Sequence, residues 1–139
     1  ARDPMYWNPE FSRRARGFAT YAVIKELGVK GIDDLIDRSC RHARDIVEQI
    51  GQLPHAEIVV MPVINQGLIR FLDPNGKSEK DHSVFTEKII LKINQSGEAF
   101  FQPATFKGKR VMRVSVSGWR TSDEDVRRTV TAVKAALNP

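Results

Sequence analysis

Apolar residues recur at helical spacing in the first part of the chain, in two stretches that glycines separate. The first stretch starts at Ser12, a suitable N-cap residue, and ends at Gly28, because glycine accepts the positive φ that terminates helices. The second stretch starts after Gly31. Its stripe is the more regular one and comprises Ile32, Leu35, Ile36, Ser39, Cys40, Ala43, Ile46, Val47 and Ile50. The pattern predicts two consecutive amphipathic helices.

Shorter apolar runs follow in the middle of the chain. Residues 58–61 form a continuous apolar run that Pro62 ends, and residues 67–72 form a second one. The short gap between them predicts two antiparallel strands joined as a hairpin. The turn-rich segment 73–81 predicts a loop, and a third helix then ends near Gly97. The apolar positions of this helix are Phe85, Ile89, Ile90 and Ile93.

The last third of the chain predicts two more strands and a helix. The strand-like stretches 99–106 and 110–117 flank residues 107–109, which have the composition of a tight turn. Overlapping capping boxes within residues 121–125 predict the start of the last helix. Helices and hairpins in this order predict an α+β fold, an antiparallel sheet of about four strands with helices packed on one face.

Length and composition indicate one globular domain without a membrane span. The chain has 139 residues, of which 41% are hydrophobic and 28% charged, and charges interrupt every apolar run well before membrane-spanning length. The N-terminus lacks the apolar region of a signal peptide, and the single cysteine forms no internal disulfide. We therefore expect a cytoplasmic protein with no membrane partner.

Basic residues are in excess only in the last third of the chain. From Lys107 onward there are 8 basic and 3 acidic residues, which leaves 14 of each sign in residues 1–106. This distribution favours a local anion-binding surface over a general polyanion-binding one. Within this part, Arg113 lies in the strand 110–117, on the face opposite Met112 and Val114. An arginine there can grip a carboxylate in a bidentate pair, or it can face solvent or form an internal salt bridge.

A second group of cations begins the first helix. Arg13, Arg14 and Arg16 follow Ser12 at the helix end where the macrodipole disfavours positive charge. These four residues either contact a partner at a domain or dimer junction or are surface side chains. Other standard chemistries lack a motif: no glycine-rich phosphate loop is present, and the three histidines have no metal-ligand spacing, so we expect no metal site.

Four segments together resemble one known family. They are Ser12-Arg13-Arg14-Ala15-Arg16-Gly17, Gly28-Val29-Lys30-Gly31-Ile32, Asn65-Gln66-Gly67-Leu68-Ile69-Arg70-Phe71 and the stretch from Met112 to Val126. As an ordered set they are similar to the C-terminal part of group II pyridoxal-phosphate-dependent amino acid decarboxylases, which include aromatic-amino-acid and glutamate decarboxylases. The resemblance implies the small domain of a fold-type I lyase at residues 12–139, with residues 1–11 as an irregular tail from the end of the large domain.

The resemblance also implies a cofactor, partners and a site residue. The cofactor is pyridoxal 5'-phosphate, the full-length enzyme is a homodimer, and Arg113 matches the small-domain arginine associated with the carboxylate of the amino acid substrate. The cofactor lysine follows a histidine in the family, and this chain contains no His-Lys pair. The chain therefore resembles a fragment that carries neither catalytic nor cofactor-binding residues, lacks the N-terminal and large domains, and is inactive alone.

Three alternatives remain open at this stage. The chain is also compatible with the small domain of another fold-type I enzyme, such as an aminotransferase, with a stand-alone basic binding module, or with a structural dimerisation domain. Aromatic residues are scarce beside the basic ones, apart from Trp119 next to Arg120, which argues against a nucleic-acid partner.

Overall fold

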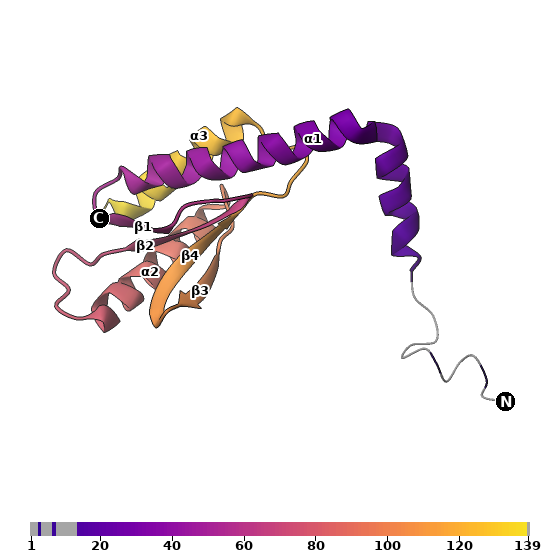
Figure 1. Ribbon diagram of the computed structural model, residues 1–139. Helices are drawn as coiled ribbons and strands as arrows, with labels where there is room; N and C mark the ends of the chain where they lie inside the picture. Colours follow the sequence, from indigo (N-terminus) through magenta and orange to yellow (C-terminus); the bar gives the residue numbers. More distant parts are fainter. Residues whose placement is uncertain (1–2, 4–6, 8–13, 139) are drawn as a thin grey trace. The chain divides into compact units, whose positions relative to one another are not determined.

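The computed structural model describes Asp3, Trp7 and residues 14–138. The chain divides into two compact units between Asp34 and Leu35. The elements in chain order are α1 (Arg16–Gly51), β1 (Ala56–Val60), β2 (Gln66–Phe71), α2 (Glu79–Ser96), β3 (Gln102–Phe106), β4 (Lys109–Ser115) and α3 (Asp123–Leu137) (Figure 1). The predicted strands and the order of the elements are confirmed.

The two predicted N-terminal helices form one run with an interruption. The interruption is at Gly28, whose φ of 61° and ψ of −172° suit only glycine, whereas Gly31 lies within the helix. The predicted N-cap Ser12 lies outside the described residues. Residues 16–27 are exposed on all sides, and the buried positions of α1 all come later. They are His42, Ala43, Ile46, Val47 and Ile50.

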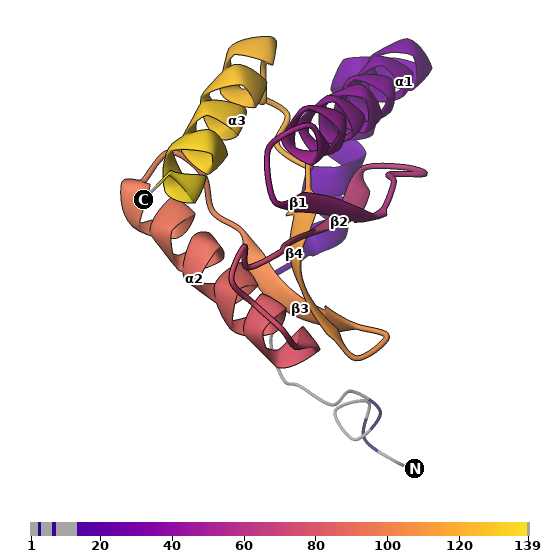
Figure 2. The same ribbon diagram turned by 90° about the vertical axis from the view of Figure 1, so that its left-hand side faces the viewer.

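The four strands form one antiparallel sheet in the order β1-β2-β4-β3. Side chains alternate between its two faces, and Ile69 on β2 is the cross-strand partner of Met112 on β4. Both residues are fully buried, on the face that α2, α3 and the Leu35–Gly51 part of α1 cover (Figure 2). A Cβ at Gly67 would lie 2.9 Å from Val47, so glycine allows α1 to approach β2 closely. The predicted α+β fold is confirmed.

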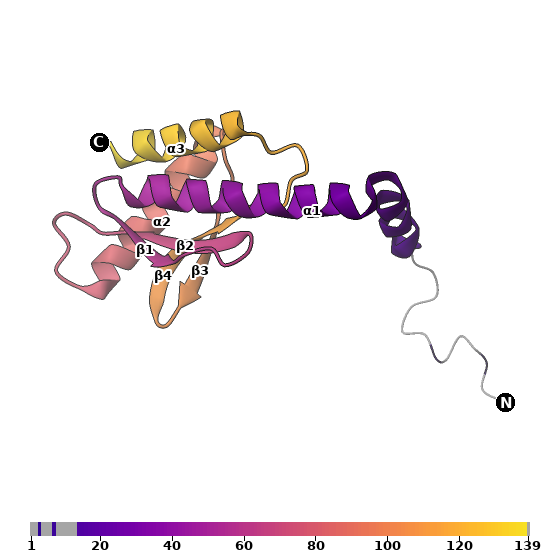
Figure 3. The ribbon, with the colours of Figure 1, turned by 45° about the horizontal axis from the view of Figure 1, so that its top comes forward.

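Polar contacts hold the helical layer in register. α3 runs alongside the Leu35–Gly51 part of α1 (Figure 3), and the buried His42 contacts Asp123 with Nε2 and Oδ1 3.0 Å apart. The side-chain amide of Asn65 donates to the Val116 carbonyl at 2.8 Å and joins the β1–β2 hairpin to the end of β4. These contacts fix the segment that leads from the sheet into α3.

Capping boxes begin both α2 and α3. Of the overlapping boxes predicted for the last helix, the structure forms Ser122 with Asp125, and α2 begins with the equivalent pair Ser78 and Asp81. In each pair the serine hydroxyl donates to the carboxylate and lowers the pKa of the aspartate. No helix in the part of the chain that the structure describes is long and apolar enough to cross a lipid bilayer.

Candidate functional site

A tight turn sets the position of Arg113 in the sheet. Lys107 and Gly108 both have positive φ, 48° and 77°, as a two-residue hairpin turn requires. The turn pairs Phe106 with Lys109, and Gln102 then lies directly opposite Arg113. Leu68 on β2 is the partner of Arg113 on its other side. Arg113 is therefore on the central strand β4, flanked by β2 and β3.

Arg113 lies on the strand face that side-chain alternation predicts, opposite Met112 and Val114. Met112 and Val114 are fully buried under the helices, whereas Arg113 and Ser115 are exposed on the second sheet face, the face opposite the helices. The Arg113 guanidinium donates from Nη2 to Oε1 of Gln102 at 2.6 Å. Since a guanidinium has five N–H donors, this bond leaves most of its hydrogen-bonding capacity free.

The partner of Arg113 distinguishes it from the other paired arginines of residues 35–138. In this region ion pairs with carboxylates are formed by Arg41, Arg70, Arg110, Arg127 and Arg128. Within the residues that the structure describes, Arg113 bonds the neutral amide of Gln102 and no carboxylate. Its positive charge is consequently not neutralised by a carboxylate of the described residues, and its side chain is exposed.

Arg70 shows the opposite arrangement on the same sheet face. Its side chain is 9% exposed and donates from Nε to Glu57 at 3.0 Å and from Nη1 to Glu79 at 2.6 Å. Burial lowers the pKa of the guanidinium, but the bonds to Glu79 and Glu57 outweigh it and raise that pKa. The bond to Arg70 in turn lowers the pKa of Glu79. This cluster joins β1, β2 and the start of α2, and its two carboxylates more than balance the charge of Arg70.

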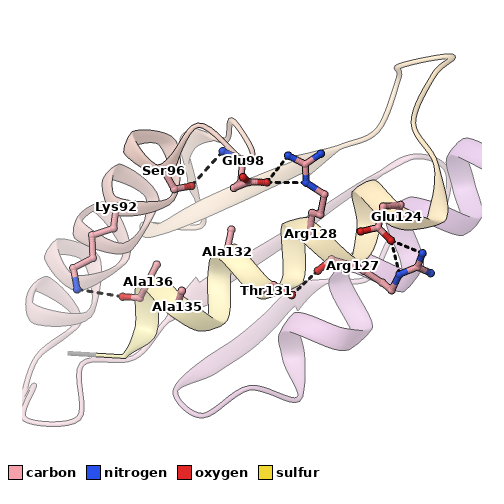
Figure 4. Close-up of a pocket in the computed structure, with 10 residues that line it drawn as sticks. All are labelled: Lys92, Ser96, Glu98, Glu124, Arg127, Arg128, Thr131, Ala132, Ala135 and Ala136. Atoms are coloured by element: carbon pink, nitrogen blue, oxygen red, sulfur yellow. Dashed lines mark hydrogen bonds and ion pairs between the residues drawn. The ribbon is translucent and has the colours of Figure 1, made fainter.

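An open groove of about 680 Å³ runs between α2 and α3 (Figure 4). Ala132, Ala135 and Ala136 form its floor, and four of its five charged side chains form ion pairs. The ion pairs are Arg127 with Glu124 and Arg128 with Glu98, while Lys92 donates to the Ala136 carbonyl at 3.3 Å. The groove therefore offers little uncompensated charge to an anion.

The other predicted site residues lie at the start of the chain. Ser12 and Arg13 lie outside the described residues, while Arg14 and Arg16 are exposed. Nothing in the structure tests their role at a domain or dimer junction, and it stays a prediction. The division into residues 1–11 and 12–139 also stays a prediction, and most of its first segment lies outside the described residues.

The lysines of the chain do not fit a covalently bound cofactor. In the described residues, the lysines are exposed except Lys109, which is half-buried at the turn between β3 and β4. Attachment of an aldehyde cofactor needs a lysine amine that loses its proton readily, and desolvation is the usual cause. No catalytic step of this chain is therefore derived through pyridoxal phosphate.

Sequence comparison identifies decarboxylases among the relatives. No family model matches the chain. It is 27% identical to mouse (Mus musculus) histidine decarboxylase over 138 residues, which are 99% of the chain and 20% of that protein. It is 26% identical to aromatic-L-amino-acid decarboxylase of Drosophila lebanonensis, covering 99% of the chain and 32% of the relative. The predicted resemblance is confirmed, and the chain spans about a fifth to a third of these relatives.

Solved structures of decarboxylases share the fold. A TDC from Oryza sativa with PLP and tryptamine superimposes with a TM-score of 0.82 at 19% identity, covering 96% of this chain and 29% of that one. A tryptophan decarboxylase from Catharanthus roseus with L-tryptophan gives a TM-score of 0.78 at 16% identity, covering 99% and 32%. At these identities the likeness establishes the fold of the chain.

Gln102 and the acidic partners of Arg70 were not found from the sequence. For Gln102 a signal was present, because a two-residue turn at Lys107-Gly108 fixes the register that places Gln102 opposite Arg113. The pairing of Arg70 with Glu79 joins β2 to the first residue of α2, and no local pattern indicates it.

Proposed function

We propose that this chain is the C-terminal domain of a pyridoxal-phosphate-dependent amino acid decarboxylase and that Arg113 binds the carboxylate of the amino acid substrate. The single observation that carries the site assignment is the pairing of Arg113 with a neutral amide on the second sheet face. The relatives support the activity, since the first ones are histidine and aromatic-L-amino-acid decarboxylases.

The chemistry of Arg113 suits a carboxylate ligand. A planar guanidinium matches the two oxygens of a carboxylate in parallel hydrogen bonds, and these charge-assisted bonds are stronger than neutral ones. β4 is a central strand with a partner on each side, so the backbone under Arg113 is held in place. Arg113 would thus bind and orient the substrate, while the chemistry takes place on groups outside this chain.

Carboxylate binding by Arg113 has a kinetic consequence. In a decarboxylation the carboxylate loses its charge as carbon dioxide departs, so the attraction of Arg113 weakens toward the transition state. An interaction that is at its strongest in the ground state lowers KM without raising kcat. We therefore assign Arg113 a role in substrate capture.

The remaining parts of the enzyme lie outside this chain. We propose that the missing N-terminal and large domains hold pyridoxal phosphate, which supplies the electron sink when it is bound. The full-length protein would be a cytoplasmic homodimer, in which residues 12–139 close over the active site and Ser12, Arg13, Arg14 and Arg16 lie near a domain or dimer junction. The resemblance of the four sequence segments supports this arrangement.

Product analysis tests the proposed activity. The full-length protein that contains this chain is incubated with pyridoxal phosphate and, in separate reactions, with L-histidine and L-tryptophan, since relatives act on histidine and aromatic amino acids. We expect the amine and carbon dioxide in equal amounts from at least one of them. An oxo acid formed by amino-group transfer, with no carbon dioxide, would assign the chain to an aminotransferase.

A further inference from the structure

We infer that Gln102 is a positioning residue that holds the Arg113 guanidinium ready for the substrate carboxylate without neutralising it. The inference rests on the proposed function of Arg113. Gln102 lies on β3 and does not touch the reacting atoms; it acts through Arg113.

The geometry of the β3–β4 hairpin brings the two side chains together. Gln102 and Arg113 are cross-strand partners on the second sheet face, and directly opposed residues of an antiparallel pair have Cβ atoms only about 5 Å apart. The 2.6 Å bond from Nη2 of Arg113 to Oε1 of Gln102 restrains a side chain that has several rotatable bonds. Both residues are exposed, so this bond is not required by burial.

The chemical identity of Gln102 matters more than its size. An amide oxygen accepts one N–H of Arg113 and carries no net charge, so the guanidinium keeps its charge for a ligand. A glutamate at this position would have nearly the same length but would form an ion pair, as Glu98 does with Arg128 at 2.7 Å. Such an ion pair would compete with the substrate carboxylate for the same donors.

The inference predicts different effects for a charged and an uncharged replacement. In the full-length holoenzyme, Gln102→Glu should raise the KM of the amino acid about 10-fold or more, because the new carboxylate competes for Arg113. Gln102→Leu removes the acceptor and adds no charge, and it should raise KM about threefold. The inhibition constant of the product amine, which has no carboxylate, should stay within about twofold of wild type in both variants.

A matched control adds the same charge on the other side of the strand. Thr105 is exposed on β3, and its side chain accepts from Arg110 rather than from Arg113. Thr105→Glu changes the net charge as Gln102→Glu does, and it should leave the KM of the amino acid within about twofold of wild type. The probes are L-histidine with histamine and L-tryptophan with tryptamine, whichever pair the enzyme uses.

The outcomes separate this inference from the proposed function. If Gln102→Glu and Thr105→Glu have the same KM, or if the amine is affected as much as the amino acid, the positioning role is overturned. If Arg113→Met raises KM and neither Gln102 variant does, only the inference on Gln102 fails. If Arg113→Met itself leaves KM unchanged, the proposed role of Arg113 is contradicted, and the inference on Gln102 falls with it. Circular dichroism verifies the fold of each variant. If Gln102→Glu misfolds, the expected threefold rise in KM for Gln102→Leu still tests the inference.

Discussion

The α2–α3 groove and the second sheet face both carry exposed arginines, but they use them differently. In the groove, Arg127 and Arg128 are bound by Glu124 and Glu98. On the sheet, Arg113 is bound by the neutral Gln102. The partner of a cation, more than its exposure, therefore decides whether its charge is available to a ligand.

Pairing with carboxylates reduces the basic excess in the last third of the chain. Arg110, Arg127 and Arg128 all belong to that excess, and each pairs with a carboxylate. Two of these carboxylates, Glu87 and Glu98, come from outside the last third, so the local count of charges overstates the positive surface. Of the two arginines of β4, Arg110 pairs with a carboxylate and Arg113 pairs with an amide.

Removing the charge of Arg113 should have the largest effect on the KM of the amino acid. Arg113→Met in the full-length enzyme should raise the KM of the amino acid about 100-fold, as expected for the loss of two charge-assisted hydrogen bonds, and should change kcat less than about threefold. Arg113→Lys retains the charge without the planar fork and should raise KM about 10-fold. Steady-state kinetics measure both, and an equal fall in kcat for both variants would contradict a role in substrate capture.

Breaking the cluster of Arg70, Glu57 and Glu79 should lower the stability of the fold rather than change the KM. Arg70→Met leaves Glu57 and Glu79 facing each other without the cation that both bind, and should lower the free energy of unfolding by about 2 kcal/mol. The two glutamates are partly exposed, which keeps the cost below that of a fully buried pair. Urea unfolding of the chain measures it, and an unchanged midpoint would show that the cluster contributes nothing.

The same cluster should make stability depend on pH. The pKa of Glu79 is lowered in the folded chain by its bond to Arg70, so its contribution is present above the unfolded pKa and is lost as pH falls through the folded pKa. Glu79→Gln should therefore lower stability by about 0.5–1 kcal/mol at pH 7, a value reduced by solvent screening. The difference from wild type should shrink as the pH falls below the ordinary range of a glutamate pKa and through the lowered pKa of Glu79. A difference that is constant across this range would assign the effect to something other than ionisation.

A substitution in the α2–α3 groove should have the smallest effect on the KM of the amino acid. Arg128→Met removes an exposed ion pair with Glu98 and leaves the sheet unchanged. The KM of the amino acid should stay within about twofold of wild type, because exposed pairs contribute little and the groove is not the proposed site. A rise in KM comparable to that of Arg113→Met would remove the distinction between the two regions.

Local patterns predicted most of the fold and one part of the site. Apolar periodicity and turn residues gave the strands, the αL end of α2 at Gly97 and the turn at Gly108, because these features depend on neighbours in sequence. The face of Arg113 followed from strand alternation. Gly31 was misjudged as a helix break, since the helical hydrogen bonds continue through it and the break falls at Gly28.

Contacts between distant segments were beyond the sequence patterns. His42 has no local feature that indicates Asp123, 81 residues away, and the two meet only because α3 lies along α1. Of the acidic partners of Arg70, Glu57 depends on the register of β1 against β2, and Glu79 depends on where α2 begins beside the sheet. The sequence alone therefore did not predict which arginines pair with carboxylates.

The most direct test of the central claim compares a ligand that has a carboxylate with one that lacks it. The KM of the amino acid and the inhibition constant of its amine are measured for the full-length wild-type enzyme and for Arg113→Met. We predict that the variant raises the KM of the amino acid about 100-fold and leaves the inhibition constant of the amine within about twofold. Equal changes for the two ligands, or no change for either, would contradict the assignment of Arg113 as the carboxylate ligand.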